Sequence, residues 1–294
     1  MIGNRRSSKI IALAQEVVAR VWRIRVVLML ALPYLVLLGW LFSADSDSDV
    51  RPAEVYTVPE QPVWKKPDAE HRFGTTGGGA DLYRLSRVAM ANSVAVSVIS
   101  SGLGVSLSFL VVMLFAFSPG ENRFRLLKVM ARAGFLLPPM MLIVILTGGA
   151  GGSLVVAMMA MSGAIAFMLA PVVAGWFEEG EGGRDILAGY ALGLTRRDIV
   201  KSRIIPIVVR RLLGVFAQLL PVVVLAEMAL SFMGFTGDRI SCGAMVAYGR
   251  ELIIEAPWMA AYPGILATVV VGALAALGAL VAGVLRTGRY PRFL

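Results

Sequence analysis

The sequence predicts an all-α integral membrane protein with about six transmembrane helices. Hydrophobic residues make up 57% of the 294 residues and charged residues only 16%, a balance too apolar for a soluble domain of this length. The apolar residues gather into runs close to the roughly 20 residues that a helix needs to cross the hydrocarbon core of a bilayer. Polar stretches separate these runs, so the pattern indicates spanning helices joined by loops.

The first residues supply an amphipathic segment and the first span. Residues 1–23 are basic and carry apolar residues at helical spacing, which is typical of a helix lying on the cytoplasmic membrane surface. Residues 24–42 form the first apolar run. No small-x-small cleavage pattern follows Phe42, so we interpret this run as a transmembrane helix and not as a signal peptide.

A long polar loop and a helical core follow. Residues 43–87 are rich in proline and acidic residues and include three successive glycines, so they are predicted to form an extracytoplasmic loop. Residues 88–285 are predicted to form a core of five transmembrane helices with a loop at 176–206, and residues 286–294 form a short tail. The five apolar runs of the core lie at 88–117, 133–147, 153–176, 207–232 and 263–285, and the short second run is expected to extend back toward Leu126.

Basic residues divide unequally between alternate loops. With the N-terminus in the cytoplasm, 20 of the 28 Lys and Arg residues fall in cytoplasmic segments and 8 fall outside. Such an excess is typical of the cytoplasmic loops of membrane proteins. Both termini and the loop 176–206 are therefore predicted to be cytoplasmic. Orientation in the lipid bilayer explains the net charge of +9, and no nucleic-acid partner is expected.

Small residues within the spans predict close contacts between helices. They recur at helical spacing in two places on the second span and in one place on the last. These sets are Ser93, Ser97 and Ser101; Ser100, Gly104 and Ser108; and Gly272, Ala276, Ala279 and Gly283.

The residues available exclude several kinds of chemistry. Cys242 is the only cysteine and His71 the only histidine, so an internal disulfide and a Cys/His metal centre are excluded. The chain has no G-x-x-x-x-G-K-[ST] nucleotide loop, no H-E-x-x-H motif and no Ser/His/Asp set. We therefore expect no enzyme activity, bound cofactor or metal in this chain, and we expect His71 to brace its loop.

The loop between the fourth and fifth spans is the most informative segment. Asp185 favours the start of a helix, and apolar residues then fall on one side of the following turns: Ile186, Leu187, Tyr190 and Leu194. Arg196 and Arg197 come next. An apolar ridge rimmed by charge suits docking into a groove of another protein, and a helix lying on the membrane surface is the alternative.

This loop resembles the cytoplasmic "EAA" loop of ABC-importer permeases, whose pattern is E-A-A-x3-G-x9-I-x-L-P. Ala188 and Gly193 match the pattern, and Pro206 falls in register with its proline. The loop departs from the pattern at four positions: Leu187, Gly189, Arg203 and Ile205.

Three more segments resemble the dipeptide, oligopeptide and nickel permeases of this class. His71-Arg72-Phe73-Gly74-Thr75 with Asp81 is similar to H-x-F-G-T-D-x-x-G-R-D, although Thr76 and Ala80 depart from it. Glu227 with Leu230-Ser231-Phe232-Met233-Gly234 is similar to E-A-x-L-S-F-L-G. The last similarity covers W-G-x-M-L, A-P-W and P-G, at Gly243-Ala244-Met245, Ala256-Pro257-Trp258 and Pro263-Gly264, with Cys242 in place of the tryptophan.

The resemblance implies a type I ABC importer permease fold in the bacterial cytoplasmic (inner) membrane. Such a subunit forms half of a path for peptides or a related small solute, beside a homologous second permease. Two ATP-binding subunits, which hold ATP and Mg, drive transport from the cytoplasm, and an extracytoplasmic substrate-binding protein delivers the solute. The residues implied in coupling to the ATPase are Asp185, Leu187, Ala188, Gly189, Gly193, Arg196, Arg197 and Pro206.

Acidic residues give further candidates. Glu227 is the one acidic residue inside a predicted span, so with Ser231 it is a candidate for the translocation path or outer gate. A structural, hydrogen-bonding role is the alternative. Glu251 and Glu255 are candidates for docking the binding protein, on one face of a short helix within 244–255. The rival function for the whole chain is a self-sufficient secondary transporter or channel that uses Glu227.

Overall fold

The computed structural model describes residues 29, 31–43, 64–117, 124–134, 139–149, 152–235, 237 and 239–287. These residues fold mainly into helices, and a single isolated β-bridge among them joins Thr75 and Asp81. Four helical segments are long and apolar enough to cross a membrane: Leu82–Ala116, Leu154–Glu181, Arg196–Phe232 and Trp258–Leu285. The described part of the chain therefore has the all-α architecture of a multi-pass membrane protein.

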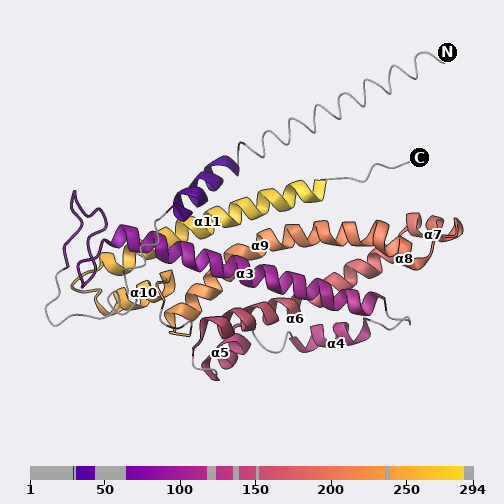
Figure 1. The fold of residues 1–294 in the computed structure, drawn as a ribbon, viewed down its shortest axis with the longest axis horizontal. Helices are drawn as coiled ribbons and strands as arrows, with labels where there is room; N and C mark the ends of the chain where they lie inside the picture. Colours follow the sequence, from indigo (N-terminus) through magenta and orange to yellow (C-terminus); the bar gives the residue numbers. More distant parts are fainter. Residues whose placement is uncertain are drawn as a thin grey trace, which may run out of the picture.

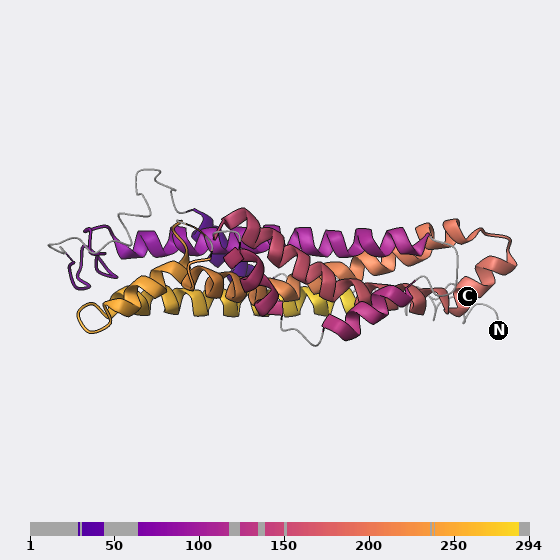
Figure 2. The ribbon, with the colours of Figure 1, turned by 90° about the horizontal axis from the view of Figure 1, so that it is seen from below.

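The long helices form an elongated bundle (Figures 1 and 2). α3 (Leu82–Ala116) packs along α6 (Leu154–Glu181), and α9 (Ile205–Phe232) packs along α11 (Trp258–Thr287) and α3. The shorter helices are α4 (Arg125–Gly134), α5 (Pro139–Gly149), α7 (Arg184–Ala191), α8 (Arg196–Ile199) and α10 (Cys242–Glu251). α10 and residues 64–81 lie at one end of the bundle, here termed the α10 end, and α7 and α8 lie at the other, the α7 end.

Four of the six predicted spans are found as long helices: α3, α6, α9 and α11. The first predicted span, 24–42, is described only in part, as a shorter helix at Ala31–Phe42. The third is divided between α4 and α5, so the described residues do not reproduce a count of six. α5 begins at Pro139, directly after Pro138, and two successive prolines cannot continue one helix because each lacks an N–H and restricts the preceding residue. The amphipathic segment 1–23 and most of the tail 286–294 lie outside the described residues.

A π-turn joins α8 to α9 without breaking the helix. The backbone N–H of Ile205 donates to the carbonyl of Val200, five residues earlier, across the π-helix Val200–Ile204. Pro206 has no N–H, and its ring would clash with a carbonyl in the ordinary helical position, so a wider turn accommodates it. The chain therefore stays helical from Arg196 to Phe232.

Small side chains let α3 approach its neighbours closely. Its serines at the predicted packing positions are fully buried, and the Ser162 hydroxyl on α6 donates to the Ser100 carbonyl at 3.1 Å. This confirms the predicted packing faces of α3. In the part of the chain that the structure describes, the predicted small face of α11 is exposed at Gly272, Ala279 and Gly283 and half-buried at Ala276. α11 instead meets α9 closely at Gly278.

Gly278→Ala is expected to destabilise the contact between α9 and α11. A Cβ atom at Gly278 would lie 2.4 Å from the carbonyl oxygen of Ala217, a backbone atom that cannot rotate away. We expect a loss of about 1–3 kcal/mol, measured as a lower thermal midpoint of the detergent-solubilised protein. Gly272→Ala is the control in the same helix, because its Cβ would meet no atom within 4 Å. Equal midpoints for the two variants would contradict this packing.

Candidate functional site

The helix predicted within the loop 176–206 is present as α7. It ends with two backbone hydrogen bonds, from the Leu194 N–H to the Gly189 carbonyl at 3.2 Å and from the Gly193 N–H to the Tyr190 carbonyl at 3.0 Å. This Schellman arrangement requires a left-handed residue at Gly193, whose φ is +81°. Gly193, the glycine that matches the "EAA" pattern, is therefore required by the local structure, because its left-handed conformation lets the chain reverse after α7.

The turn after α7 exposes apolar side chains. Leu192 is 83% exposed, and Tyr190 and Leu194 are also exposed, whereas Ile186 is buried in the core at the α7 end. The predicted apolar face is therefore divided between the core and the surface. Leu192, which the pattern did not single out, is the most exposed of the four because it lies where the chain reverses. Three other coupling candidates on α7 have side chains that lie outside the described part of the structure: Asp185, Leu187 and Ala188.

The "EAA" pattern has an alanine where this chain has Gly189, and the structure has no steric requirement for a glycine at this position. A Cβ atom there would lie 3.4–3.6 Å from side-chain atoms of Ile199 and Leu194, which is ordinary van der Waals contact. An alanine would therefore fit, and this departure leaves the shape of the segment unchanged.

The acidic run at the end of α6 holds neighbouring helices in place. Its three carboxylates form ion pairs with α4, α9 and α8: Glu178–Lys128 at 2.7 Å, Glu179–Arg211 at 2.9 Å and Glu181–Arg196 at 3.2 Å. Arg196 also donates to the carbonyl of Ala116, at the end of α3, at 2.7 Å. Its guanidinium is thus engaged with neighbouring helices, whereas Arg197 is exposed. Of the two arginines predicted at a docking rim, Arg197 has the exposure that this role requires.

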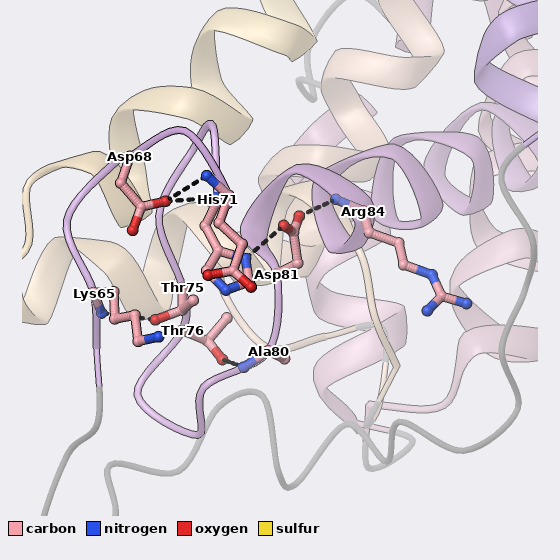
Figure 3. Close-up of polar contacts among 9 residues, drawn as sticks. Lys65, Asp68, His71, Thr75, Thr76, Ala80, Asp81 and Arg84 are labelled. Atoms are coloured by element: carbon pink, nitrogen blue, oxygen red, sulfur yellow. Dashed lines mark hydrogen bonds and ion pairs between the residues drawn. The ribbon is translucent and has the colours of Figure 1, made fainter.

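Residues 64–81 form a hydrogen-bonded loop at the start of α3 (Figure 3). His71 Nδ1 lies 3.0 Å from Asp81 Oδ2, while Asp81 Oδ1 accepts from the Arg84 N–H at 3.0 Å and so caps α3. Asp68 Oδ1 accepts from the His71 N–H at 2.6 Å, and this hydrogen bond lowers the pKa of the exposed Asp68 carboxyl. His71 therefore braces the loop, as predicted.

Two departures from the permease pattern, Thr76 and Ala80, bond to each other. The Thr76 N–H donates to the Ala80 carbonyl at 2.9 Å, and the Ala80 N–H donates to Thr76 Oγ1 at 3.2 Å. Thr76 is buried. Where the pattern has an acid and an arginine, this chain has a neutral turn closed by its own hydrogen bonds.

The 64–81 loop is fixed to the start of α11. The rings of Phe73 and Tyr262 are stacked, with centroids 4.3 Å apart and an interplanar angle of 6°. A Cβ atom at Gly74 would lie 2.8 Å from Nε1 of Trp258, so the loop backbone runs directly against the indole. Together with the packing of α10 on α9 and α11, these contacts bring three of the four permease-like segments together at the α10 end.

Glu227 is fully buried in α9 and forms an ion pair with Arg239. Its Oε1 accepts hydrogen bonds from Ser231 Oγ at 2.7 Å and from Arg239 Nη2. Oε2 has no hydrogen-bond partner among the described residues. The structure thus joins two predicted candidates, Glu227 and Ser231, and adds a third residue. Because both candidates are buried, lining a path would require the helix or loop around them to move.

Arg239 reaches Glu227 because the chain reverses after α9. The Phe235 N–H donates to the Leu230 carbonyl at 2.9 Å, and Gly234, with φ at +80°, closes a second Schellman turn. This turn uses the glycine of the E-A-x-L-S-F-L-G similarity. The end of α9 and the returning chain are therefore held close together.

Sequence reasoning missed Arg239, although a signal was present. A carboxylate inside a span needs a counter-charge, and Arg239 and Arg250 are the two basic residues between α9 and α11. α3 holds the returning chain through two hydrogen bonds, from Asn92 Nδ2 to the Ile240 carbonyl at 3.0 Å and from the Cys242 N–H to Ser93 Oγ at 3.3 Å.

Cys242 is expected to resist labelling in the folded protein. Its Sγ donates to the Pro263 carbonyl at 3.3 Å, and burial, with a smaller effect from the Glu227 carboxylate, raises the pKa of the Cys242 thiol to about 12. Because the thiolate is the reactive form, a maleimide near neutral pH should modify Cys242 only after denaturation in SDS. Mass spectrometry of the intact chain measures this, and rapid labelling before denaturation would contradict the burial of Cys242.

α10 ends at Glu251, so the helix predicted within 244–255 is shorter than expected. Residues 252–255 form a turn, and Pro257 disfavours helical geometry at the residue before it. Glu251 and Glu255 are both exposed, but they do not share a helical face because Glu255 lies in the turn.

Comparison with known proteins identifies the fold. Neither the protein-family models nor the curated proteins give a match. The fold is similar to a solved structure described as "Crystal structure of an amino acid ABC transporter with histidines". The TM-score is 0.52 at 15% sequence identity, and the similarity covers 68% of this chain and 94% of that chain. The described helices therefore have the fold of an ABC transporter chain.

Proposed function

We propose that the chain is a permease subunit of a bacterial ATP-driven ABC importer related to the dipeptide, oligopeptide and nickel class. One observation carries the proposal: the "EAA"-like segment lies at one end of the bundle, and the three other permease-like segments lie together at the opposite end (Figure 1). The similarity of the fold to an amino acid ABC transporter chain supports the permease role. The four similar segments support the finer class.

In this proposal, the α7 end receives force from the ATP-binding subunits. The exposed turn around Leu192 enters a groove on one of them, and α7 moves when the two subunits, which hold ATP and Mg, close. The helix from Arg196 to Phe232 joins this turn to the α10 end. This chain supplies half of the path for a peptide or related small solute, and a homologous second permease supplies the other half.

The same proposal sets the orientation in the inner membrane. The α7 end and both termini face the cytoplasm, in line with the excess of basic residues there. The α10 end faces outward, where Glu251 and Glu255 are available to a substrate-binding protein.

Purification of the tagged chain from its native membrane tests the function. We expect two ATP-binding subunits and a second permease to co-purify, and we expect ATP hydrolysis by this complex to rise when the substrate-binding protein is added. A chain that purifies alone and catalyses ion-driven uptake in liposomes would instead support the secondary transporter or channel. The Glu227–Arg239 pair disfavours that alternative, because a carboxylate held by a guanidinium is not free to exchange an ion.

A further inference from the structure

Gln218 is a polar side chain in the most apolar part of α9. It is the one polar side chain among residues 212–226, and it lies seven residues after Arg211 and nine residues before Glu227. At 1.5 Å per residue, these separations along the helix are about 10 Å and about 14 Å. The Gln218 amide is therefore near the middle of the span and away from the charges at both ends.

The Gln218 side chain is exposed on the surface of this chain. No hydrogen bond joins its amide to another residue in the part of the chain that the structure describes. Thr268 is exposed too, but its hydroxyl donates to the Gly264 carbonyl of its own helix at 2.9 Å. Because lipid hydrocarbon offers no hydrogen-bond partner, an amide that faces it costs free energy. Gln218 is therefore expected to face a polar group or water and not lipid tails.

Gln218 belongs to an exposed stripe along α9. Val222 and Leu225, four and seven residues later, fall on the same side of the helix and are 61% and 53% exposed. These three residues are here termed the Gln218 stripe. α11 runs beside it, since a Cβ at Gly278 would lie 3.3 Å from the Cα of Gln218. Close contacts between membrane helices use small residues, so the valine and the leucine suit an open path better than a tightly packed partner helix.

We propose that the Gln218 stripe lines the aqueous path of the solute and that Gln218 binds the peptide groups of the solute in the middle of the membrane. This inference rests on the proposed importer function and adds a solute-binding residue to it. The amide of Gln218 donates through its N–H and accepts through its carbonyl, as a peptide bond does, so the two can pair through two hydrogen bonds. Such an uncharged contact is strong enough to receive the solute and weak enough to release it.

Cysteine labelling of the complete transporter in lipid nanodiscs tests whether the stripe faces water. The probe is 2-sulfonatoethyl methanethiosulfonate, a water-soluble anion that reacts with the thiolate. We expect Gln218→Cys and Val222→Cys to gain the added mass at least tenfold faster than Ile99→Cys. Ile99 is the matched control, because it is 50% exposed on α3 and lies about 18 Å along the helix from Arg87. The parental chain gives the background, since its one cysteine, Cys242, is buried.

Uptake of radiolabelled trialanine by proteoliposomes that contain the complete transporter tests the ligand. Gln218→Leu keeps most of the side-chain volume but removes the hydrogen bonds, so we expect uptake per folded complex to fall about tenfold. Gln218→Asn is the conservative comparison. It keeps an amide and is expected to lose less uptake than Gln218→Leu.

The outcomes separate this inference from the proposed function. Labelling of Gln218→Cys and Val222→Cys as slow as that of Ile99→Cys overturns the path along the stripe and leaves the importer function in place. A lower yield of the complex with Gln218→Leu would show that the amide bonds a partner helix and would also overturn the inference. Parental uptake in Gln218→Leu, or a parental transporter that takes up no trialanine, overturns the peptide ligand. A chain that purifies without ATP-binding subunits overturns the proposed function and this inference together.

Discussion

Arg239→Ala is expected to reduce the amount of folded protein in the membrane sharply. The substitution leaves the carboxylate of Glu227 buried with Ser231 but without its counter-charge. Removing one partner of a buried ion pair costs about 3–5 kcal/mol, which is comparable with the whole stability of many domains. The measurements are the membrane abundance and the thermal midpoint of the purified chain.

The double variant Glu227→Ala with Arg239→Ala is the control for this prediction. It is expected to be more stable than Arg239→Ala alone, because no uncompensated buried charge remains. Glu227→Gln in the parent separates charge from hydrogen bonding, since the amide keeps an acceptor for Ser231. If the effects of the two alanine substitutions simply add, the two side chains do not interact as the structure describes.

Leu192→Asp is expected to abolish most transport while leaving the chain folded. Leu192 is 83% exposed, so the free chain loses little packing when it is replaced. In the proposed complex its side chain is enclosed by an ATP-binding subunit, where a carboxylate would be buried without a partner. We expect at least a tenfold fall in solute uptake per folded complex, with ATP hydrolysis either lost or no longer linked to uptake.

Variants of Gly193 provide the matched comparison. Asparagine tolerates the left-handed conformation at φ +81°, so Gly193→Asn should keep the turn and most transport. Gly193→Trp adds backbone strain and a bulky side chain. Because a Cβ at Gly193 would meet no atom within 4 Å, the indole would obstruct the ATP-binding subunit and not a neighbour in this chain. Normal complex yield and uptake in Gly193→Trp and Leu192→Asp would count against docking at this turn.

Hydropathy was sufficient to predict the four long helices because a chain in hydrocarbon has few alternatives. Backbone groups there must bond within their own segment, so a long apolar run folds as a helix. The boundaries were less predictable. α3 begins at Leu82, before the apolar run, because Asp81 caps it. α6 continues to Glu181 because its final carboxylates bond to neighbouring helices and not to water alone.

The sequence was sufficient to select Glu227 as a candidate, but it did not show which side chains Glu227 and Arg196 contact. A charge inside a span draws attention to Glu227, but its partner depends on how the chain turns at Gly234 and where α3 holds it. Spacing also cannot show which way an arginine points. Arg196 looked like part of a docking rim, yet it donates to the carbonyl of Ala116, which is distant in the sequence.

The contact between Gly278 and Ala217 lies between the two ends of the long helix Arg196–Phe232. Pro221 lacks the N–H that would bond to the Ala217 carbonyl in a regular helix, so α11 meets α9 where this backbone hydrogen bond is missing. At 1.5 Å per residue, Arg196 lies about 32 Å to one side of this contact and Glu227 about 15 Å to the other. Rigid rotation about this point would move the two ends in opposite directions, and Glu227 would travel about half as far as Arg196.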